Sequence, residues 1–332
     1  MPSSVHLVTS LLGMMLVGGV YADGWAHLNA GGLDTFFTPW HGMLYGGFSL
    51  LLLWVLVVVL HRRRRGAAWG RSVPEGYQAG VVGIVIFALG GFLDLAWHTA
   101  LGVETGIGAL ISPTHLLLLM GGVTLLSSPL RAWAATRPQS MHPPTSMLLP
   151  WYAVLAVAAV TALAAFFLSY LSVFASPGAV TALTTIPEGA AGHTEAELTT
   201  VAGAGAYLVG TVLLVGAYLY ARRFGDLPLG GLTVLVAAVA IPGAFLTDFE
   251  YAIPAVTAVV ATALLDLGFA AHRSAVVAAA LPGVVWTGQL VGLNITGDIA
   301  WPPELWSGVI VLSILGGFAI HLIAAPSPSR PT

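Results

Sequence analysis

Ten long apolar runs constrain this chain more than any other feature of its sequence. Each is close to the ~20 residues that an α-helix needs to cross the hydrocarbon core of a bilayer. Of the 332 residues, 57% are hydrophobic and only 8% are charged, against roughly 25% charged in an ordinary soluble domain. The sequence therefore predicts an all-α, polytopic membrane bundle of about ten transmembrane helices. The predicted spans are 4–22, 41–60, 79–100, 113–131, 149–174, 198–221, 228–247, 255–272, 274–293 and 304–324.

The arginines predict the orientation of these spans. With ten spans and both termini inside, every arginine falls on the cytoplasmic face, as the positive-inside rule requires. The chain contains no lysine and is rich in alanine, glycine and valine, which favours a GC-rich prokaryotic genome. We therefore predict a multi-pass protein of a prokaryotic cell membrane. The arginines are Arg62 to Arg65, Arg71, Arg131, Arg137, Arg222, Arg223, Arg273 and Arg330.

The segments between the spans suggest how they are grouped. A proline- and serine-containing stretch at 132–148 is predicted to be a cytoplasmic linker. It would join a four-span unit at 1–131 to a six-span unit at 149–325, with 326–332 as a cytoplasmic tail. The end of the first span resembles a signal-peptide cleavage site, but no positive charge precedes the apolar run. An uncleaved first helix is expected.

The composition excludes several classes of function. The chain has no basic patch of the kind that nucleic-acid binding needs, so no nucleic-acid partner is expected. It also has no cysteine. Disulfides, iron–sulfur clusters and thiolate sites are therefore ruled out, and imidazole and carboxylate remain as the strong metal ligands.

Two stretches repeat the same order of metal-ligating residue types. Each places an aspartate four residues before a histidine, which puts both side chains on one face of a helix. A carboxylate near a helix C-terminus opposes the helix dipole, so a cation should compensate it. No arginine lies on that face, which leaves a metal ion or protons. The stretches are Asp23, His27 and Thr38-Pro39-Trp40-His41, then Asp94, His98 and Ser112-Pro113-Thr114-His115.

The second half of each stretch predicts a helix start. Thr38-Pro39 and Ser112-Pro113 are typical of an N-cap residue followed by proline at the first helical position. His41 and His115 then lie at the third position, where the positive end of the dipole disfavours protonation. A neutral imidazole is available as a ligand. Each predicted hairpin thus presents an aspartate and two histidines at the extracytoplasmic face.

The duplicated hairpin could hold two separate metal sites or converge on one. Nitrogen and oxygen ligands suit copper, zinc or iron better than calcium or magnesium. Asp34 and Glu104, in the turns between the halves, could bind directly or orient an imidazole. A weak echo of the pattern around Trp301-Pro302-Pro303-Glu304 makes Glu304 a further candidate ligand.

Asp23, His27 and His41 form an Asp-x3-His-x13-His arrangement. It resembles the Asp-x3-His-x12-His metal motif in the C subunit of the copper membrane monooxygenases, which oxidise methane and ammonia. The resemblance covers about nineteen of the 332 residues, and the second stretch departs from it with a longer spacing. It implies a copper site of Asp23, His27 and His41 near the outer membrane face.

The leading hypothesis is a metal-binding integral membrane protein, with copper favoured over zinc or iron, acting as an oxidoreductase on a small neutral or hydrophobic substrate. Its expected ligands are Asp23, His27, His41, Asp94, His98 and His115. Three alternatives remain open: a transporter or insertion factor for metal ions or protons, a haem protein, and a non-enzymatic membrane subunit that docks other subunits.

Overall fold

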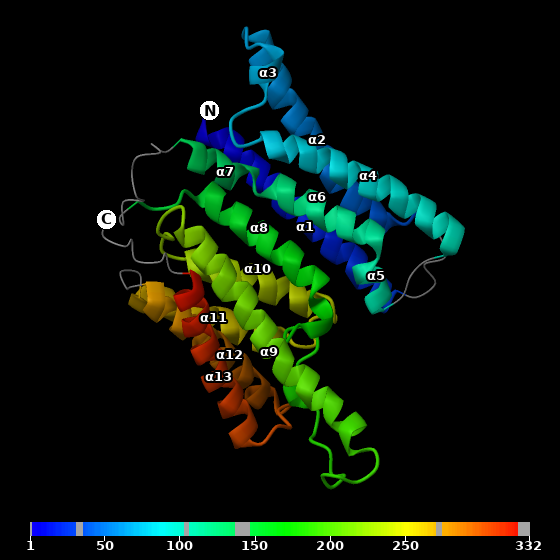
Figure 1. Ribbon diagram of the computed structural model, residues 1–332, viewed down its shortest axis with the longest axis vertical. Helices are drawn as coiled ribbons and strands as arrows, with labels where there is room; N and C mark the ends of the chain where they lie inside the picture. Colours follow the sequence, from blue (N-terminus) through cyan, green and yellow to red (C-terminus); the bar gives the residue numbers. More distant parts are fainter. Residues whose placement is uncertain (1, 31–35, 103–105, 137–146, 270–273, 325–332) are drawn as a thin grey trace, which may run out of the picture.

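The computed structural model describes residues 2–30, 36–102, 106–136, 147–269 and 274–324, and most of these are helical (Figure 1). Within them the only β-structure is an isolated bridge between Leu148 and Asp226. Short 3-10 helices form at Ser169–Leu171 and Gly178–Val180. The α-helices are α1 (Ser3–Asn29), α2 (Pro39–Arg64), α3 (Trp69–Ser72), α4 (Gln78–Leu101), α5 (Ile107–Ile111), α6 (Pro113–Leu126), α7 (Ser128–Ala135), α8 (Trp151–Phe167), α9 (His193–Arg222), α10 (Gly231–Phe245), α11 (Ala252–Phe269), α12 (Ser274–Thr296) and α13 (Pro303–Ala324).

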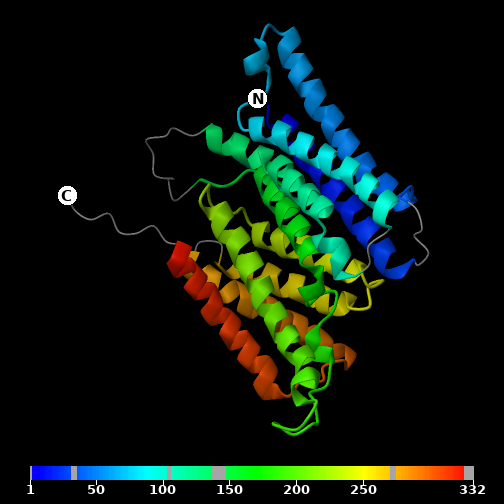
Figure 2. The same cartoon turned by 45° about the vertical axis from the view of Figure 1, so that its right-hand side comes forward.

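The helices pack mainly as sequence neighbours. In the first half, α1 pairs with α2 and α4 pairs with α6. Helix α8 packs against both pairs through α1 and α6, and it also contacts α10. In the second half, α10 to α13 pack in chain order, with α9 lying across α12 and α13. The first and last helices consequently occupy opposite sides of the molecule, separated by α8 and α9 (Figures 1 and 2).

The all-α, membrane-like character predicted from the sequence is confirmed. Seven helical segments of the described residues are long and apolar enough to cross a bilayer: α1, α2, α4, the α6–α7 segment Pro113–Ala135, α9, α12 and α13. The other three predicted spans correspond to the shorter apolar helices α8, α10 and α11. The number of ten spans remains a prediction.

The predicted span 149–174 is longer than the helix that forms there. Helix α8 ends at Phe167, and the chain continues through the 3-10 helix Ser169–Leu171. The apolar run continues past the point where the backbone leaves the α-helix, so hydropathy alone overestimates this helix.

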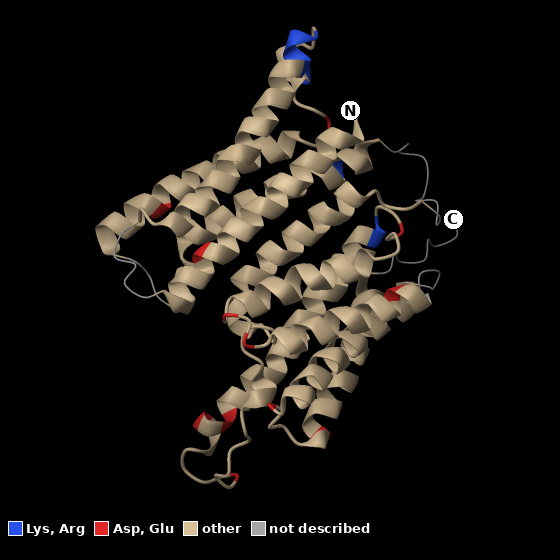
Figure 3. Ribbon diagram, turned by 180° about the vertical axis from the view of Figure 1, so that it is seen from behind, with Lys and Arg blue, Asp and Glu red and all other residues tan. Residues whose placement is uncertain are grey.

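Charge is segregated between the two ends of the bundle. Among the described residues, the arginines gather at the end where α2, α7 and α9 finish, whereas most acidic residues lie toward the opposite end (Figure 3). This distribution matches the pattern from which the orientation was predicted. Which end faces the cytoplasm, and where the termini lie, remain predictions.

Two hydrophobic cores fill the bundle. The first is built by α1, α2, α4, α6 and α8 around side chains such as Leu16, Leu51 and Leu125. The second lies among α9 to α13, around Tyr207 and Trp286. Most buried residues of α8 belong to the first core. The first core therefore includes a helix from beyond residue 131, where the predicted four-span unit ends. The division into units at 1–131 and 149–325, joined by a linker at 132–148, stays a prediction.

A buried acid outside the repeated stretches has a structural partner. Asp266 on α11 accepts hydrogen bonds from the backbone N–H of Thr233 at 2.9 Å and from its hydroxyl at 2.8 Å. Thr233 lies in the first turn of α10, where N–H groups have no partner within the helix. Asp266 therefore caps α10 from the neighbouring helix.

Glycines let α1 and α2 approach until their backbones touch. A Cβ atom added at Gly47 would lie 2.9 Å from Leu16 Cα, and one at Gly19 would lie 2.8 Å from Leu44 Cα. Real Cβ atoms do not approach other atoms this closely. By contrast, Gly46 faces open space, with nothing within 4 Å of its added Cβ.

We expect Gly47→Ala to force α1 and α2 apart and to lower the free energy of unfolding by about 1–3 kcal/mol, the usual effect of overpacking. The adjacent Gly46→Ala should leave stability unchanged or raise it slightly, since alanine favours the helix. Thermal unfolding of both variants in the same detergent measures the difference. Equal midpoints would contradict the close approach.

Candidate metal centre

The last turns of α1 carry the first two candidate ligands. The helix continues to Asn29, seven residues beyond the predicted span, so Asp23 and His27 lie one turn apart on a single helical face. His27 Nε2 is 3.8 Å from Asp23 Oδ2. Asp23 is only 7% exposed, while His27 is partly accessible.

The start of α2 brings His41 to the same carboxylate. Thr38 has an extended backbone, its hydroxyl accepts a hydrogen bond from the backbone N–H of His41 at 3.1 Å, and Pro39 takes the first helical position. The predicted N-cap is thus confirmed. The same hydroxyl lies 3.1 Å from His41 Nδ1, which turns the other ring nitrogen toward Asp23. His41 Nε2 is 3.6 Å from Asp23 Oδ2.

The second stretch makes the same contacts from α4 and α6. His98 Nε2 is 3.4 Å from Asp94 Oδ1, one turn earlier on α4. Ser112 caps α6 and lies 2.6 Å from Nδ1 of His115 through its hydroxyl. His115 Nε2 is then 3.6 Å from Asp94 Oδ1.

The two stretches meet in one continuous cluster that passes through His41. Ring centroids are separated by 5.9 Å between His27 and His41, 6.1 Å between His41 and His98, and 6.1 Å between His98 and His115. Two groups of possible ligands overlap there, each with its ligand atoms within 4.8 Å of one another. One is Asp23, His27 and His41, and the other is His41, Asp94 and His98.

The spacing and burial of these atoms suit a metal ion. Metal–nitrogen and metal–oxygen bonds of about 2.0–2.2 Å separate neighbouring ligand atoms by roughly 3–4 Å, and the carboxylate–imidazole pairs are 3.4–3.8 Å apart. Within the described residues, neither Oδ1 of Asp23 nor Nε2 of His41 has a hydrogen-bond partner, although both atoms are buried. An unsatisfied buried polar atom costs about 1–3 kcal/mol. A coordinated cation would remove that cost.

Several side chains that support the cluster were not singled out from the sequence. The hydroxyls of Tyr45 and Thr114 donate to Asp94 Oδ2 and Oδ1, at 3.3 and 3.1 Å. The ring of Phe36 stacks on His41 with centroids 4.7 Å apart. One signal was available: Tyr45 follows His41 by four residues, so both share a face of α2. Thr114 and Phe36 gave no comparable signal. Thr114 meets Asp94 only because α4 and α6 pack together, and Phe36 precedes α2, so helical spacing does not predict its contact with His41.

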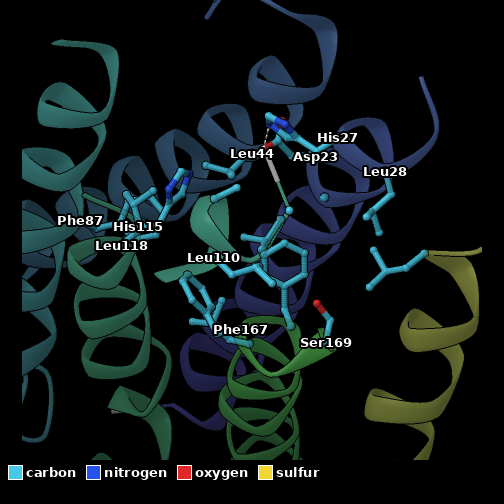
Figure 4. A pocket seen from close by; sticks show the side chains of 17 residues that line it. Asp23, His27, Leu28, Leu44, Phe87, Leu110, His115, Leu118, Phe167 and Ser169 are labelled. Atoms are coloured by element: carbon cyan, nitrogen blue, oxygen red, sulfur yellow. Dashed lines mark ion pairs between the residues drawn. The ribbon is translucent and has the colours of Figure 1, made fainter. Parts of the chain in front are cut away.

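A small cavity opens beside the cluster. It has a volume of about 100 Å³ and lies among α1, α5, α6 and α8. Figure 4 shows Asp23 and His27 on one side of it, His115 on another, and Phe167 and Ser169 across from them. The polar side chains that line the cavity are those of Asp23, His27, His115 and Ser169. The rest of the lining is apolar and includes Phe87, Leu110, Leu118, Leu163 and Phe166.

The remaining sequence candidates lie elsewhere. Asp34 and Glu104 fall outside the described residues, so their proposed roles stay predictions. Glu304 is exposed in the first turn of α13. That helix packs against α9 and α12, and Glu304 belongs to neither ligand group found among the described residues.

Comparison with known proteins finds no matching family model, no matching curated protein and no matching solved structure.

We expect Thr38→Val to destabilise the protein by about 1 kcal/mol, because valine keeps the shape of the side chain but cannot cap α2. Thr38→Ser keeps the hydroxyl and should retain most of the stability. Thermal unfolding in detergent compares the two variants with wild type. A Thr38→Val protein as stable as Thr38→Ser would show that the cap contributes nothing.

Proposed function

We propose that this chain is an integral membrane metalloprotein whose centre is the buried cluster at the ends of α1, α2, α4 and α6. One observation carries the proposal: His41 belongs to two overlapping groups of carboxylate and imidazole ligands. Polar atoms this deeply buried are costly unless something pairs with them. Ionisable groups inside membrane-spanning helices are a reason to infer a functional site.

In this proposal the two hairpins act as equivalent halves of the centre. Asp23 binds with His27 and His41, and Asp94 binds with His98 and with either His41 or His115, so the two halves share His41. Each half therefore offers one carboxylate oxygen and two imidazole nitrogens, leaving coordination positions free. Thr38 and Ser112 orient an imidazole in each half through its Nδ1 atom, as metal-ligating histidines generally require.

Copper is the metal we favour, in line with the resemblance of the first stretch to the copper membrane monooxygenases. Iron is the second choice, because two histidines and one carboxylate with open positions are also typical of non-haem iron sites. Zinc binds the same atoms but has no redox chemistry. The proposed ligand set accommodates all three.

The cavity beside the cluster favours a proposed oxidoreductase activity on a small neutral molecule. Its apolar lining favours an uncharged guest, and Asp23, His27 and His115 bring that guest next to the proposed metal. A bound copper or iron ion would supply redox chemistry there. At about 100 Å³ the cavity is well below the roughly 300–1,000 Å³ of sites for drug-sized ligands and cofactors, so it argues against a haem group in this cavity.

A metal-ion or proton transporter is the second candidate function. The row of four imidazoles gives it some support, since such groups can pass a cation along. It would also need polar groups that continue through the bilayer. Gln289 is occupied by Tyr207 and the carbonyl of Val173 in the second core, and Asp266 caps α10. The contacts of these two side chains support a structural role instead.

We expect purified wild-type protein to contain stoichiometric metal and His41→Ala to lose most of it, because His41 serves both ligand groups. His27→Ala, which removes a ligand of only one group, should lose less. Elemental analysis by mass spectrometry gives the metal identity and stoichiometry. Electron paramagnetic resonance of the oxidised protein would show nitrogen hyperfine structure if the metal is copper.

His193→Ala is the matched control, since this histidine pairs with Glu197 at the start of α9 and should not affect metal content. A well-folded wild-type protein without metal would overturn the proposal and favour a non-enzymatic subunit. So would full metal content in the His41→Ala variant.

We expect Leu110→Trp to fill the cavity and to weaken the binding of a small neutral ligand to the metal, while metal content stays unchanged. Carbon monoxide added to the reduced protein is a suitable probe for copper or iron, followed by its infrared stretching band. The control is Ile111→Trp, because Ile111 is 52% exposed and does not line the cavity. Equal carbon monoxide binding in both variants would mean that the cavity does not lead to the metal.

A further inference from the structure

A second concave site lies at the arginine-rich end of the bundle, away from the metal centre. One face of α2 changes along its length from apolar to cationic: Trp54, Val57 and Val58 are followed by His61, Arg62 and Arg65. The spacing of three, four, seven, eight and eleven residues from Trp54 keeps all of them on one side of the helix. This stripe leads from the apolar middle of the helix to its charged end.

The stripe forms one wall of a groove of about 710 Å³. Pro2 and Val5, at the start of α1, form the facing wall, and Gly66 and Ala67 close the charged end. The last turns of α2 extend beyond the neighbouring helices (Figures 1 and 2). The groove is also next to the N-terminus of α1, where Pro2 provides no side-chain cap. The positive end of the helix dipole lies there.

The basic residues at this end differ in whether their side chains are hydrogen-bonded within the protein. Arg62 donates to the carbonyls of Ser72 and Arg71, and Arg63 donates to the carbonyl of Ala67. These bonds hold the turn after α2. Among the described residues, no hydrogen bond or ion pair occupies the side chains of His61 and Arg65, both of which line the groove. Two cationic or hydrogen-bonding groups therefore remain available to an anion.

We propose that this groove binds an anionic phospholipid of the surrounding bilayer. Its phosphate lies against His61 and Arg65, and an acyl chain runs along Val57 and Trp54 toward the middle of the membrane. The match is one of charge and of depth: Arg65 and His61 lie at the end of a membrane-spanning helix, where headgroups are found, and the apolar groups lie where acyl chains are found. This site is independent of the proposed metal chemistry.

Native mass spectrometry of the full chain in mixed micelles tests the proposal, with dioleoyl phosphatidylglycerol and dioleoyl phosphatidylcholine as the two probes. We expect wild type to retain phosphatidylglycerol in preference to phosphatidylcholine. Arg65→Gln should weaken this binding about fivefold, as expected for one arginine at a membrane surface. Adding His61→Gln should weaken it further.

Arg64→Gln is the matched control, since it removes the same charge from the same turn but Arg64 does not line the groove. It should bind phosphatidylglycerol nearly as well as wild type. Size-exclusion profiles and thermal midpoints verify that all variants are folded. Equal losses in Arg64→Gln and Arg65→Gln would overturn the proposal, because diffuse charge would then explain the binding. Displacement of the lipid by millimolar inorganic phosphate would also overturn it in favour of a free-anion site.

Discussion

The burial of two aspartates beside four histidines is the constraint on which the first half of the structure depends. Asp23 and Asp94 are 7% and 1% exposed, and a carboxylate removed from water is costly unless it is paired. The nitrogens of two imidazoles lie 3.4–3.8 Å from each carboxylate. One imidazole of each pair comes from the start of the next long helix. Helices α2 and α6 must therefore begin where α1 and α4 end, which determines the shape of both hairpins.

Contacts along the helices then hold the cluster in place. Gly19 and Gly47 allow α1 and α2 to touch, and Phe48 of α2 stacks on Phe87 of α4 with ring centroids 4.6 Å apart. Tyr45 connects the same two helices by bonding Asp94. Phe48 and Phe87 belong to the first core, and Tyr45 packs against it. A site on rigid helices with supported ligands is better organised for binding than one on loops.

The parts of the centre that could be predicted from the sequence are the local ones. The Asp23–His27 pair and the Thr38 cap depend on spacings of three or four residues, which helix geometry determines. The meeting of His41 and His98 could not be predicted, because it depends on how two hairpins pack across many intervening residues. Hydropathy located the seven long apolar segments and the shorter helices α8, α10 and α11. It overestimated the length of α8, since it cannot detect where a backbone leaves the α-helical conformation within an apolar run.

Because His41 belongs to both ligand groups, the binding of one metal ion would affect the binding of a second. A single imidazole nitrogen has one lone pair and can coordinate one ion at a time, yet His41 belongs to both ligand groups. An ion bound beside Asp23 would take this ligand from the group around Asp94, where His115 would have to replace it. The binding free energies of two ions would therefore be coupled, with the second ion entering a site that the first has already altered.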